Sequence, residues 1–267
     1  MAIQPHNEKA AATWGSGGAG YDKVSETIAD SIEHMLNRLD VQPGEKVLDL
    51  ATGTGWTARR LAQKGAIVVA VDIGEGVIAA AREFAKAANL SVQFIVGDAE
   101  KVDLPTAKFD AVTSTCGVMF ASRPEEVAKE LGRLCRPGGR IGLTTWPPTS
   151  AIAKMFQMMK PYMPPPPALP PPSPFEWGRE ERVTELLGHD FDLKFEIGTT
   201  VLRMPSGEAV WKVFSEGYGP TKALYQYAGE RKEDLHRDFV AFHEHFRTAN
   251  LGVAMPRDYL VILGTRH

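Results

Sequence analysis

The sequence has few cysteines and no excess of basic charge, and these two shortages exclude several classes of protein. Only two of the 267 residues are cysteines, Cys116 at the end of an apparent strand and Cys135 in a helix-like run. Two are too few for a disulfide framework, so we expect both to be small buried side chains. Lys and Arg number 30 against 33 Asp and Glu, a net charge of −3. With no alternation of aromatic and basic residues, we expect no nucleic-acid partner.

Long apolar segments are also missing. The sequence contains no run of about 18 apolar residues, so we expect no transmembrane helix and no membrane insertion. Its first residues lack the basic region and apolar core of a secretory signal. These features predict a soluble, cytoplasmic protein. Hydrophobic residues make up 43% of the chain, enough to build the core of one large domain or of one domain with a sizeable insertion.

Strand-like and helix-like segments alternate between residues 45 and 146. A helix is expected over 123–139, because Pro lies near its start and Gly just after its end. Such alternation predicts βαβ units. The fold class expected is therefore α/β, a doubly wound, mostly parallel Rossmann-like sheet with a final antiparallel strand and a mainly helical cap insertion. The strands expected in this region are 45–50, 66–73, 91–98, 109–117 and 140–146.

The segments outside this alternation predict two further parts. Residues 1–44 should form an N-terminal lid and helix, before a core over 45–146. Residues 147–267 should combine an acceptor cap with the last two strands, over 190–204 and 257–267. The proline-rich segment 164–174 is expected to be a stiff connection, because proline fixes φ and lowers the entropy cost of an ordered loop.

A glycine-rich loop, in the stretch VLDLATGTGWTA over 47–58, follows the first strand. No lysine follows its glycines, which argues against a nucleoside triphosphate site. Residues 53–58 do fit the dinucleotide pattern GxGxx(G/A), and Asp72 ends the next strand, where a ribose-binding acid belongs. An NAD(P)-dependent oxidoreductase is therefore one interpretation of this loop.

Three other features favour a different cofactor. Asp49 precedes Gly53 by four residues, where its charge would repel a pyrophosphate but attract a ligand that carries an ammonium and a sulfonium. Asp98 ends the third strand, where it can accept a hydrogen bond from an exocyclic amine such as that of adenine. About 45 residues precede the first strand, whereas dinucleotide-binding domains often begin near it.

Together, Asp49–Gly55, Asp72 and Gly97–Glu100 resemble the successive cofactor motifs of the class I S-adenosylmethionine-dependent methyltransferases. The sequence is similar to their small-molecule branch, often called UbiE-like or Methyltransf_11-like, mainly over residues 20–146. The resemblance implies a methyltransferase that uses S-adenosyl-L-methionine to methylate a small-molecule acceptor by in-line displacement. A non-catalytic protein that binds this cofactor is a second alternative. A homodimer is compatible with the sequence, which does not determine the oligomeric state.

Carried over to this sequence, the resemblance assigns residues to each part of the cofactor. Simpler roles stay open for three of them: Asp49 as a turn cap, Asp72 as a helix N-cap and Asp98 as an Asx-turn residue. The implied contacts are Asp49, Thr52, Gly53 and Gly55 for the methionyl part, Asp72 for the ribose, Ile73, Asp98 and Ala99 for the adenine, and Thr115 and Cys116 beside the sulfonium.

The acceptor side of the site has weaker signals. His243 and His245 flank an apolar stripe of a predicted helix, where either could be a general base or an ordinary boundary residue. No cluster with evident metal spacing is visible, so no metal is expected. Enzymes that methylate the amino groups of DNA bases carry an Asn/Asp-Pro-Pro-aromatic motif after the fourth strand. Residues 116–120 (CGVMF) stand at that place without the motif, which argues against DNA as the acceptor. The candidates for the acceptor pocket are aromatic: Trp14 and Tyr21, which flank a possible lid over 15–20, and Phe120, Trp146, Trp177 and Tyr218.

Overall fold

A mixed β-sheet forms the centre of the molecule. The computed structural model describes residues 2–166, 170–250 and 252–267, so the middle of the proline-rich segment, 167–169, lies outside the described residues. Within the described residues the sheet has the order β3-β2-β1-β4-β5-β8-β6, with a short β7 paired to β8. Its strands are β1 (Lys46–Leu50), β2 (Ile67–Asp72), β3 (Val92–Val96), β4 (Phe109–Thr115), β5 (Cys135–Thr145), β6 (Phe191–Met204), β7 (Arg247–Thr248) and β8 (Gly252–Arg266).

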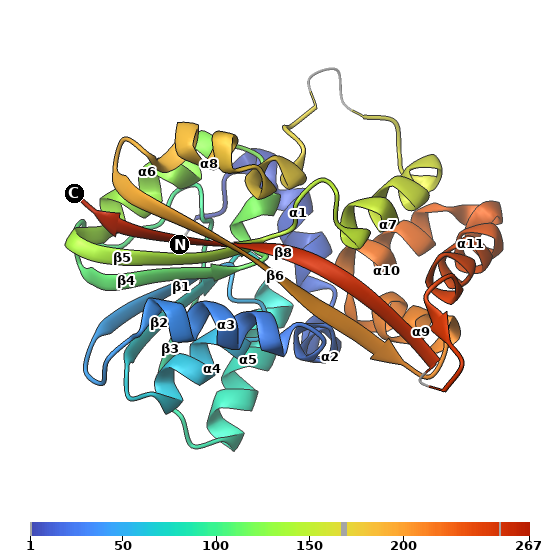
Figure 1. The fold of residues 1–267 in the computed structure, drawn as a ribbon, viewed down its shortest axis with the longest axis horizontal. Coiled ribbons are helices and arrows are strands. Elements are labelled where there is room, and N and C mark those ends of the chain that lie inside the picture. Colours follow the sequence, from blue (N-terminus) through green and yellow to red (C-terminus); the bar gives the residue numbers. More distant parts are fainter. Residues whose placement is uncertain (1, 167–169, 251) are drawn as a thin grey trace.

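The first five strands are parallel, and β8 is inserted antiparallel between β5 and β6. This arrangement confirms the predicted doubly wound, Rossmann-like fold with an antiparallel final strand. Helices cover both faces of the sheet, so the residues of β1 after Lys46 are buried (Figure 1). One face carries α3 (Ala29–Leu39), α4 (Trp56–Gln63) and α5 (Glu75–Ala87), and the other carries α6 (Pro124–Leu134) and α8 (Glu180–Leu187).

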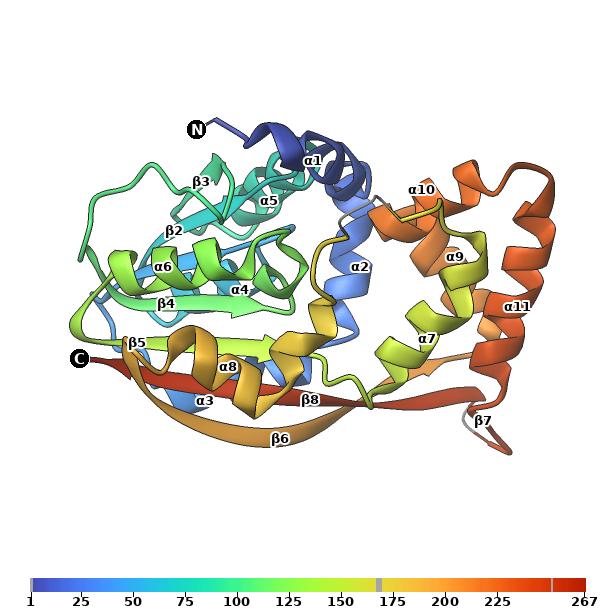
Figure 2. The same ribbon diagram turned by 90° about the horizontal axis from the view of Figure 1, so that it is seen from above.

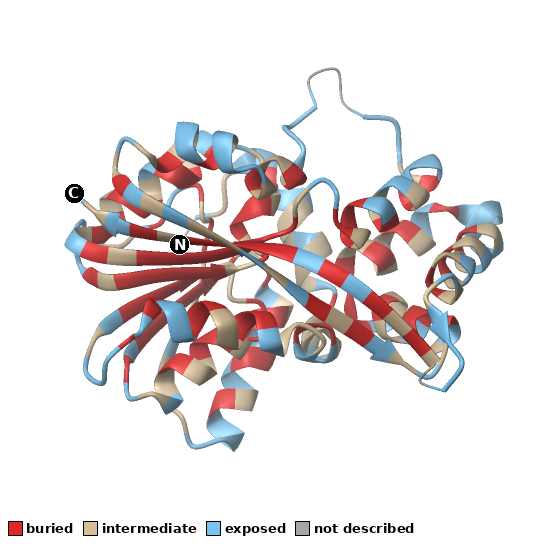
Figure 3. Ribbon diagram, viewed as in Figure 1, coloured by how far each residue is buried: buried red, intermediate tan, exposed pale blue. Residues whose placement is uncertain are grey.

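Beyond the main sheet, β6 and β8 continue as a long two-stranded ribbon. They pair from Phe191 to Met204, whereas β5 pairs only with residues 260–265 of β8. The ribbon reaches a helical lobe at the far end of the molecule (Figure 2), and its burial alternates between buried and exposed along each strand (Figure 3). The lobe, called the cap from here on, consists of α7 (Ala151–Met159), α9 (Gly207–Gly217), α10 (Gly219–Tyr227) and α11 (Lys232–Glu244).

Three predicted boundaries were wrong. The helix expected over 123–139 ends at Leu134, and Cys135 begins β5 rather than lying in a helix, because Pro137 cannot continue a helix and Gly138 has a φ of 68°. The last strand begins at Gly252, five residues before the expected start at Arg257, because the pairing with β6 extends to Val253.

The third correction concerns the N-terminal helix. The helix expected within residues 1–44 is divided into α2 (Tyr21–Glu26) and α3, with the break at Thr27 and Ile28. The side chain of Arg257 donates a hydrogen bond to the carbonyl oxygen of Thr27, which takes this acceptor away from helical pairing. The residues before α2 form η1 (Pro5–Asn7), α1 (Glu8–Gly15) and η2 (Gly18–Gly20).

The remaining short helices connect these elements: η3 (Val118–Phe120), η4 (Lys160–Tyr162), η5 (Pro174–Gly178) and η6 (Gly229–Arg231). Among the helices described, none is long and apolar enough to cross a membrane.

Candidate functional site

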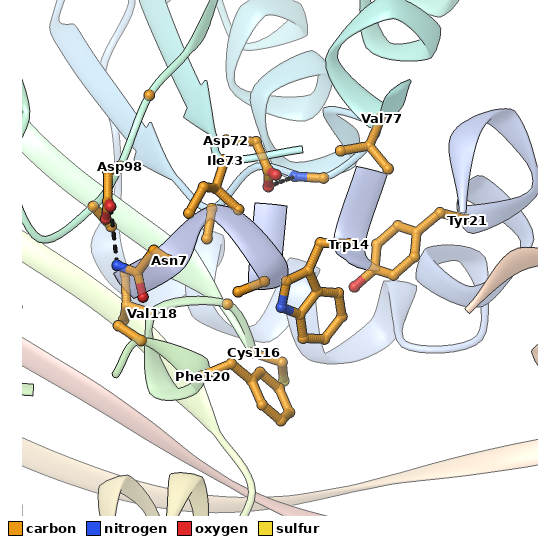
Figure 4. Close-up of a pocket in the computed structure, with 17 residues that line it drawn as sticks. Asn7, Trp14, Tyr21, Asp72, Ile73, Val77, Asp98, Cys116, Val118 and Phe120 are labelled. Carbon is orange, nitrogen blue, oxygen red and sulfur yellow. Dashed lines mark hydrogen bonds between the residues drawn. The ribbon is translucent and has the colours of Figure 1, made fainter. Parts of the chain in front are cut away.

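A hollow lies at the carboxyl ends of β1, β2, β3 and β4, beneath the N-terminal helices (Figure 4). It contains about 720 Å³ of space that no atom fills, including its open mouth, within the range of small-molecule sites. Nine of the predicted site residues line it: Trp14, Tyr21, Gly53, Asp72, Ile73, Asp98, Ala99, Cys116 and Phe120. The other lining residues are Asn7, Ala10, Ala51, Val77, Gly97, Gly117, Val118 and Ala121.

The glycine loop has a backbone that only small residues fit. Ala51, Gly53 and Gly55 have positive φ values of 53°, 57° and 79°. A Cβ on Gly53 would lie 2.9 Å from the Tyr21 ring, and one on Gly55 would lie 2.8 Å from the Phe94 ring. Gly53 therefore keeps the floor of the hollow open, whereas Gly55 lets the loop pack on β3.

Asp72 binds the backbone of two loops. One carboxylate oxygen accepts a hydrogen bond from the amide of Gly53 at 2.8 Å, and the other accepts from the amide of Gly74 at 2.8 Å. Burial raises the pKa of Asp72, and these two amides oppose the rise. The N-cap of α5 is Gly74, so Asp72 does not cap that helix. Its carboxylate joins the glycine loop to the loop after β2 and lines the hollow between them.

Asp49 lies deeper, in a second hollow that shares Tyr21, Ala51 and Gly53 with the first. Its oxygens accept hydrogen bonds from the hydroxyls of Thr52, at 2.5 Å, and Thr113, at 2.7 Å. Burial raises the pKa of Asp49 to about 7. Asp49 forms no ion pair with any described residue, so this buried carboxyl lacks a counter-charge.

Asp98 ties the N-terminal segment to the end of β3. One of its oxygens accepts hydrogen bonds from the amide of Gln4, at 3.1 Å, and from the side chain of Asn7, at 2.9 Å. The other accepts from the amide of Glu100 at 3.0 Å, which is an Asx-type turn. Asp98 thus makes the Asx-turn contact that was one of the roles left open by the sequence. It also binds the N-terminal segment, a contact that the sequence did not predict.

We call this connection the N-terminal latch: Gln4, His6 and Asn7 held by Asp98, Glu100 and Ser122. Asn7 also accepts a hydrogen bond from Ser122 at 2.7 Å, and His6 contacts Glu100 at 2.7 Å. Sequence reasoning missed Asn7, which is 3% exposed and lines the hollow. Its position before a helix gave a signal for a turn but none for a partner 91 residues away.

The end of β4 lies between the two hollows. Thr115 shares a hydrogen bond of 2.9 Å with Thr57 in the deeper hollow. Cys116 has a φ of 49°, and its thiol lies 3.5 Å from the Thr144 hydroxyl. Burial raises the pKa of Cys116 to about 12. The thiol therefore stays protonated at neutral pH and is a poor nucleophile.

Aromatic side chains close the hollow on the cap side. The Trp14 ring lies 5.1 Å from the ring of Phe120 and 5.4 Å from that of Tyr218. Tyr218 stacks on Tyr21 at 6.1 Å. The structure therefore brings four of the six aromatic candidates together, three in the wall and Tyr218 directly behind it. Segment 15–20, the expected lid, lies in this wall as the end of α1 and η2.

Trp146 and Trp177 are not among the residues that line either hollow. Trp177 is 2% exposed and packs in η5, where its carbonyl accepts a hydrogen bond from Thr145 at 2.8 Å. Trp146 lies against the Arg257 guanidinium, which is 5.9 Å from its ring centre.

The two histidine candidates lie at the end of α11, His243 within the helix and His245 at its C-cap. His243 is 0% exposed, and its Nδ1 donates to the Phe239 carbonyl at 2.8 Å. Burial lowers the pKa of His243 to about 4. His245 is exposed, with Nδ1 donating to the Ala241 carbonyl at 2.7 Å. Neither lines the hollow. The described residues include no group of three or more His, Cys, Asp or Glu that could hold a metal ion.

Comparison with known proteins gives this geometry a family context. A model of a methyltransferase domain matches residues 47–139, which include the glycine loop, Asp72 and Asp98. The uncharacterized protein Rv1405c of Mycobacterium tuberculosis is 36% identical over 209 residues, 78% of this chain and 76% of that protein. A demethylmenaquinone methyltransferase of Corynebacterium glutamicum is 39% identical over 129 residues, 46% of this chain and 54% of that enzyme.

A solved structure shares the fold of this chain. The crystal structure of the YcgJ protein from Bacillus subtilis has a TM-score of 0.63 and 15% identity, covering 89% of this chain and 98% of that one. The motifs at the ends of β1, β2 and β3 lie around two adjoining hollows, as the family resemblance implies. The chain is a methyltransferase that belongs to the class I S-adenosylmethionine-dependent family, whose cofactor is S-adenosyl-L-methionine.

Proposed function

We propose that the protein methylates a small-molecule acceptor by in-line displacement, in the space where the ends of β4 and β5 meet the cap. The observation that carries this proposal is the position of the aromatic wall: Trp14, Tyr21 and Phe120 line the cofactor hollow while Tyr218, from the cap, packs on two of them. An enclosed wall of aromatic rings suits a small, partly apolar acceptor. A macromolecular substrate would need an open surface at this point.

The residues present fit the cofactor. Asp49 is a buried carboxyl whose partners, two hydroxyls and the Ala58 backbone, are all uncharged, so a ligand ammonium would supply its missing counter-charge. We assign Asp72 to the ribose hydroxyls, since its carboxylate lines the hollow beside the glycine loop. Asp98 and Ala99 are assigned to the adenine edge, with Ile73 against its face. When bound, the cofactor supplies an electrophilic methyl group on a sulfonium.

The protein's own contribution to the reaction is alignment and exclusion of water. Residues such as Asp49, Asp72 and Asp98 would hold the cofactor so that an acceptor atom could displace the methyl group in line, with the electron pair of the carbon–sulfur bond left on sulfur. Cys116, protonated beside the end of β4, does not compete as a nucleophile. A general base is required only if the acceptor must lose a proton before or during attack.

The acceptor of the Corynebacterium relative is not carried over, because that match covers 46% of this chain. The proposal is tested by transfer of an isotope-labelled methyl group from S-adenosylmethionine into a small-molecule metabolite extract, followed by mass identification of the product. The matched control is Asp72→Ala. We expect a labelled product with the wild-type protein and a large loss with the variant. Binding of S-adenosylhomocysteine without any labelled product would contradict the proposal and favour a non-catalytic binding protein.

A further inference from the structure

A buried arginine lies where the β6–β8 ribbon leaves the main sheet. Arg257 is 1% exposed and pairs with Thr200 across the ribbon. Alternation along β8 puts Arg257 on the same face as Val253 and Met255, which are both 0% exposed. The sequence therefore puts a cation on a strand face whose other positions are apolar, and sequence reasoning missed this signal.

The protein satisfies this cation only in part. The guanidinium donates to the hydroxyl of Thr27 at 3.1 Å and to the carbonyl of the same residue, and it lies over the Trp146 ring. Its Nε has no hydrogen-bond partner among the residues that the structure describes. No carboxylate among the described residues forms an ion pair with it. The charge of Asp30 raises the pKa of Arg257, but the Asp30 carboxylate accepts its hydrogen bonds from Thr200 and Ser31 rather than from the guanidinium.

An unpaired buried charge is costly, and proteins seldom keep one without a use. Burial lowers the pKa of Arg257 to about 10, so the guanidinium still carries its charge at neutral pH. A hydrophobic residue of similar length would be expected to suit this face better. The free Nε and the lack of a direct ion pair with any described carboxylate together indicate a position for an anion.

Arg257 lines neither hollow, but its contacts lead to the wall of the first one. Trp146, the ring under the guanidinium, directly follows β5, and Thr144 of β5 contacts the Cys116 thiol in the hollow wall. Burial dominates the pKa shifts of Cys116 and His243, and the charge of Arg257 contributes a lowering effect to both. Arg257 is therefore close to one residue of the cofactor hollow and to one of the cap.

A second unsatisfied atom lies in the same region. Because Nδ1 of His243 donates to a carbonyl, its Nε2 carries a lone pair, and that atom is buried with no partner in the described part of the chain. Aromatic contacts connect His243 to the hollow: its ring is 6.4 Å from Phe214, which is 5.5 Å from Tyr218, which stacks on Tyr21. The Nε of Arg257 is thus a free donor and the Nε2 of His243 a free acceptor, and aromatic contacts connect the second to the aromatic wall.

We propose that Arg257 binds an anionic oxygen of the acceptor, either a carboxylate or an ionised hydroxyl. The proposal rests on the proposed function, since it narrows the acceptor class of the same site. The acceptor then combines an apolar body, which contacts the aromatic wall, with one acidic group directed to the ribbon.

The first test uses benzoate and benzamide, which have nearly the same shape and differ in charge. Each is titrated by calorimetry into the protein saturated with S-adenosylhomocysteine. We expect benzoate to bind at least about tenfold more tightly than benzamide, because hydrogen bonds to charged groups are the stronger kind. Arg257→Met should remove this preference and Arg257→Lys should keep part of it. The matched control Arg203→Met removes an exposed cation from the neighbouring strand and should leave the preference unchanged.

Equal binding of the two probes, no binding of either, or an unchanged preference in Arg257→Met would each overturn the proposal. If Arg257→Met does not fold, the proposal is decided by the difference between benzoate and benzamide binding in the wild-type protein and in Arg257→Lys. Labelled methyl transfer separates this test from that of the proposed function. If the wild-type protein makes no labelled product but still prefers benzoate, only the proposed function is contradicted. If folded Arg257→Met keeps the wild-type kcat/KM, only the anion site is contradicted. A product retained on an anion exchanger indicates a carboxylate beside the methylated atom, and a neutral product indicates methylation of the anionic oxygen.

Discussion

The residues up to Trp146, called the cofactor half here, and the residues after it, called the cap half, differ in how completely they satisfy their own buried polar groups. In the cofactor half, Asp49, Asp72 and Asp98 each accept at least two hydrogen bonds from the protein. Four buried side-chain atoms in the described residues have no partner, and all four follow Trp146 in the sequence. They are Trp177 Nε1, Thr221 Oγ1, His243 Nε2 and Arg257 Nε.

This difference shows where the protein is complete without a ligand. A buried polar group without a partner costs about 1–3 kcal/mol, so such atoms are rare unless something else binds them. The cofactor half holds its loops in place through its own carboxylates and is preorganised. The cap half keeps its four unsatisfied atoms, two of them in the cap itself at Thr221 and His243, as a region that recognises the acceptor would.

The largest expected effect tests whether Trp177, in η5 beside α8, is a packing residue or part of the surface that recognises the acceptor. Trp177→Ala should lower the free energy of unfolding by about 3–5 kcal/mol, because a fully buried ring is lost. Affinity for S-adenosylhomocysteine should stay within about twofold in the folded protein, since the residue lies outside the hollow. Denaturant unfolding measures the first quantity and calorimetry the second. Trp177→Phe is the control for size. Wild-type stability combined with lost acceptor use would instead make Trp177 a pocket residue.

Next in size is the loss of the carboxylate that joins the two cofactor loops. Asp72→Ala should reduce affinity for S-adenosylhomocysteine at least about tenfold, because hydrogen bonds to charged groups are each worth about 1.5–3 kcal/mol. Calorimetric titration of the folded variant measures the change. Asp258→Ala, at an exposed position on the ribbon, is the matched control. Unchanged affinity with a lower melting temperature would restrict Asp72 to a structural role.

Tyr218→Ala tests the division between the halves at the point where they touch. Loss of a ring from the aromatic wall should lower kcat/KM for the acceptor about tenfold. Affinity for S-adenosylhomocysteine should change by less than about twofold, because Tyr218 stands behind the residues that line the hollow. Tyr218→Phe keeps the ring and serves as the control. A large loss of cofactor affinity with intact acceptor kinetics would show that the two halves do not divide these tasks.

A smaller effect should follow from the pKa of Asp49. The ligand ammonium favours the ionised carboxylate, so binding weakens as pH falls through the raised pKa of about 7 and the carboxyl becomes protonated. Between pH 7.5 and pH 6, affinity for S-adenosylhomocysteine should fall about eightfold by proton linkage. Isothermal titration at several pH values measures this slope. Asp49→Asn should remove the slope, and a slope that persists in this variant would assign it to another group.

The smallest effect concerns the N-terminal latch. Asn7→Ala removes the hydrogen bonds to Asp98 and from Ser122 at the mouth of the hollow. The dissociation rate of S-adenosylhomocysteine should rise about fivefold, corresponding to about 1 kcal/mol for one net hydrogen bond. Stopped-flow displacement measures the rate. Ser122→Ala removes only the outer bond and should have a smaller effect. An unchanged rate would mean that the latch does not limit ligand release.

The sequence was sufficient for the cofactor half because its signals are local. Periodicity located β1 to β4, and the acids and glycines that follow these strands predicted one site, since parallel strands end at the same edge of a sheet. The structure places Asp49, Gly53, Asp72 and Asp98 around two adjoining hollows, as that rule requires. The β5 boundary was missed because a helix pattern continued up to Pro137.

The cap half depended on contacts between residues that are far apart in the chain. Asn7 contacts Asp98 across 91 residues, and Arg257 contacts Thr27 across 230 residues. Periodicity put His243 and His245 on opposite flanks of one helix without showing that the first is enclosed and the second exposed. Local pattern determines which face of an element is apolar, but burial, tautomer and partner depend on the element that packs against that face. For this protein the sequence therefore predicted the methyltransferase family, its cofactor and the strand ends that surround the hollow, whereas only the tertiary structure decided which side chains form the aromatic wall and which ones are enclosed.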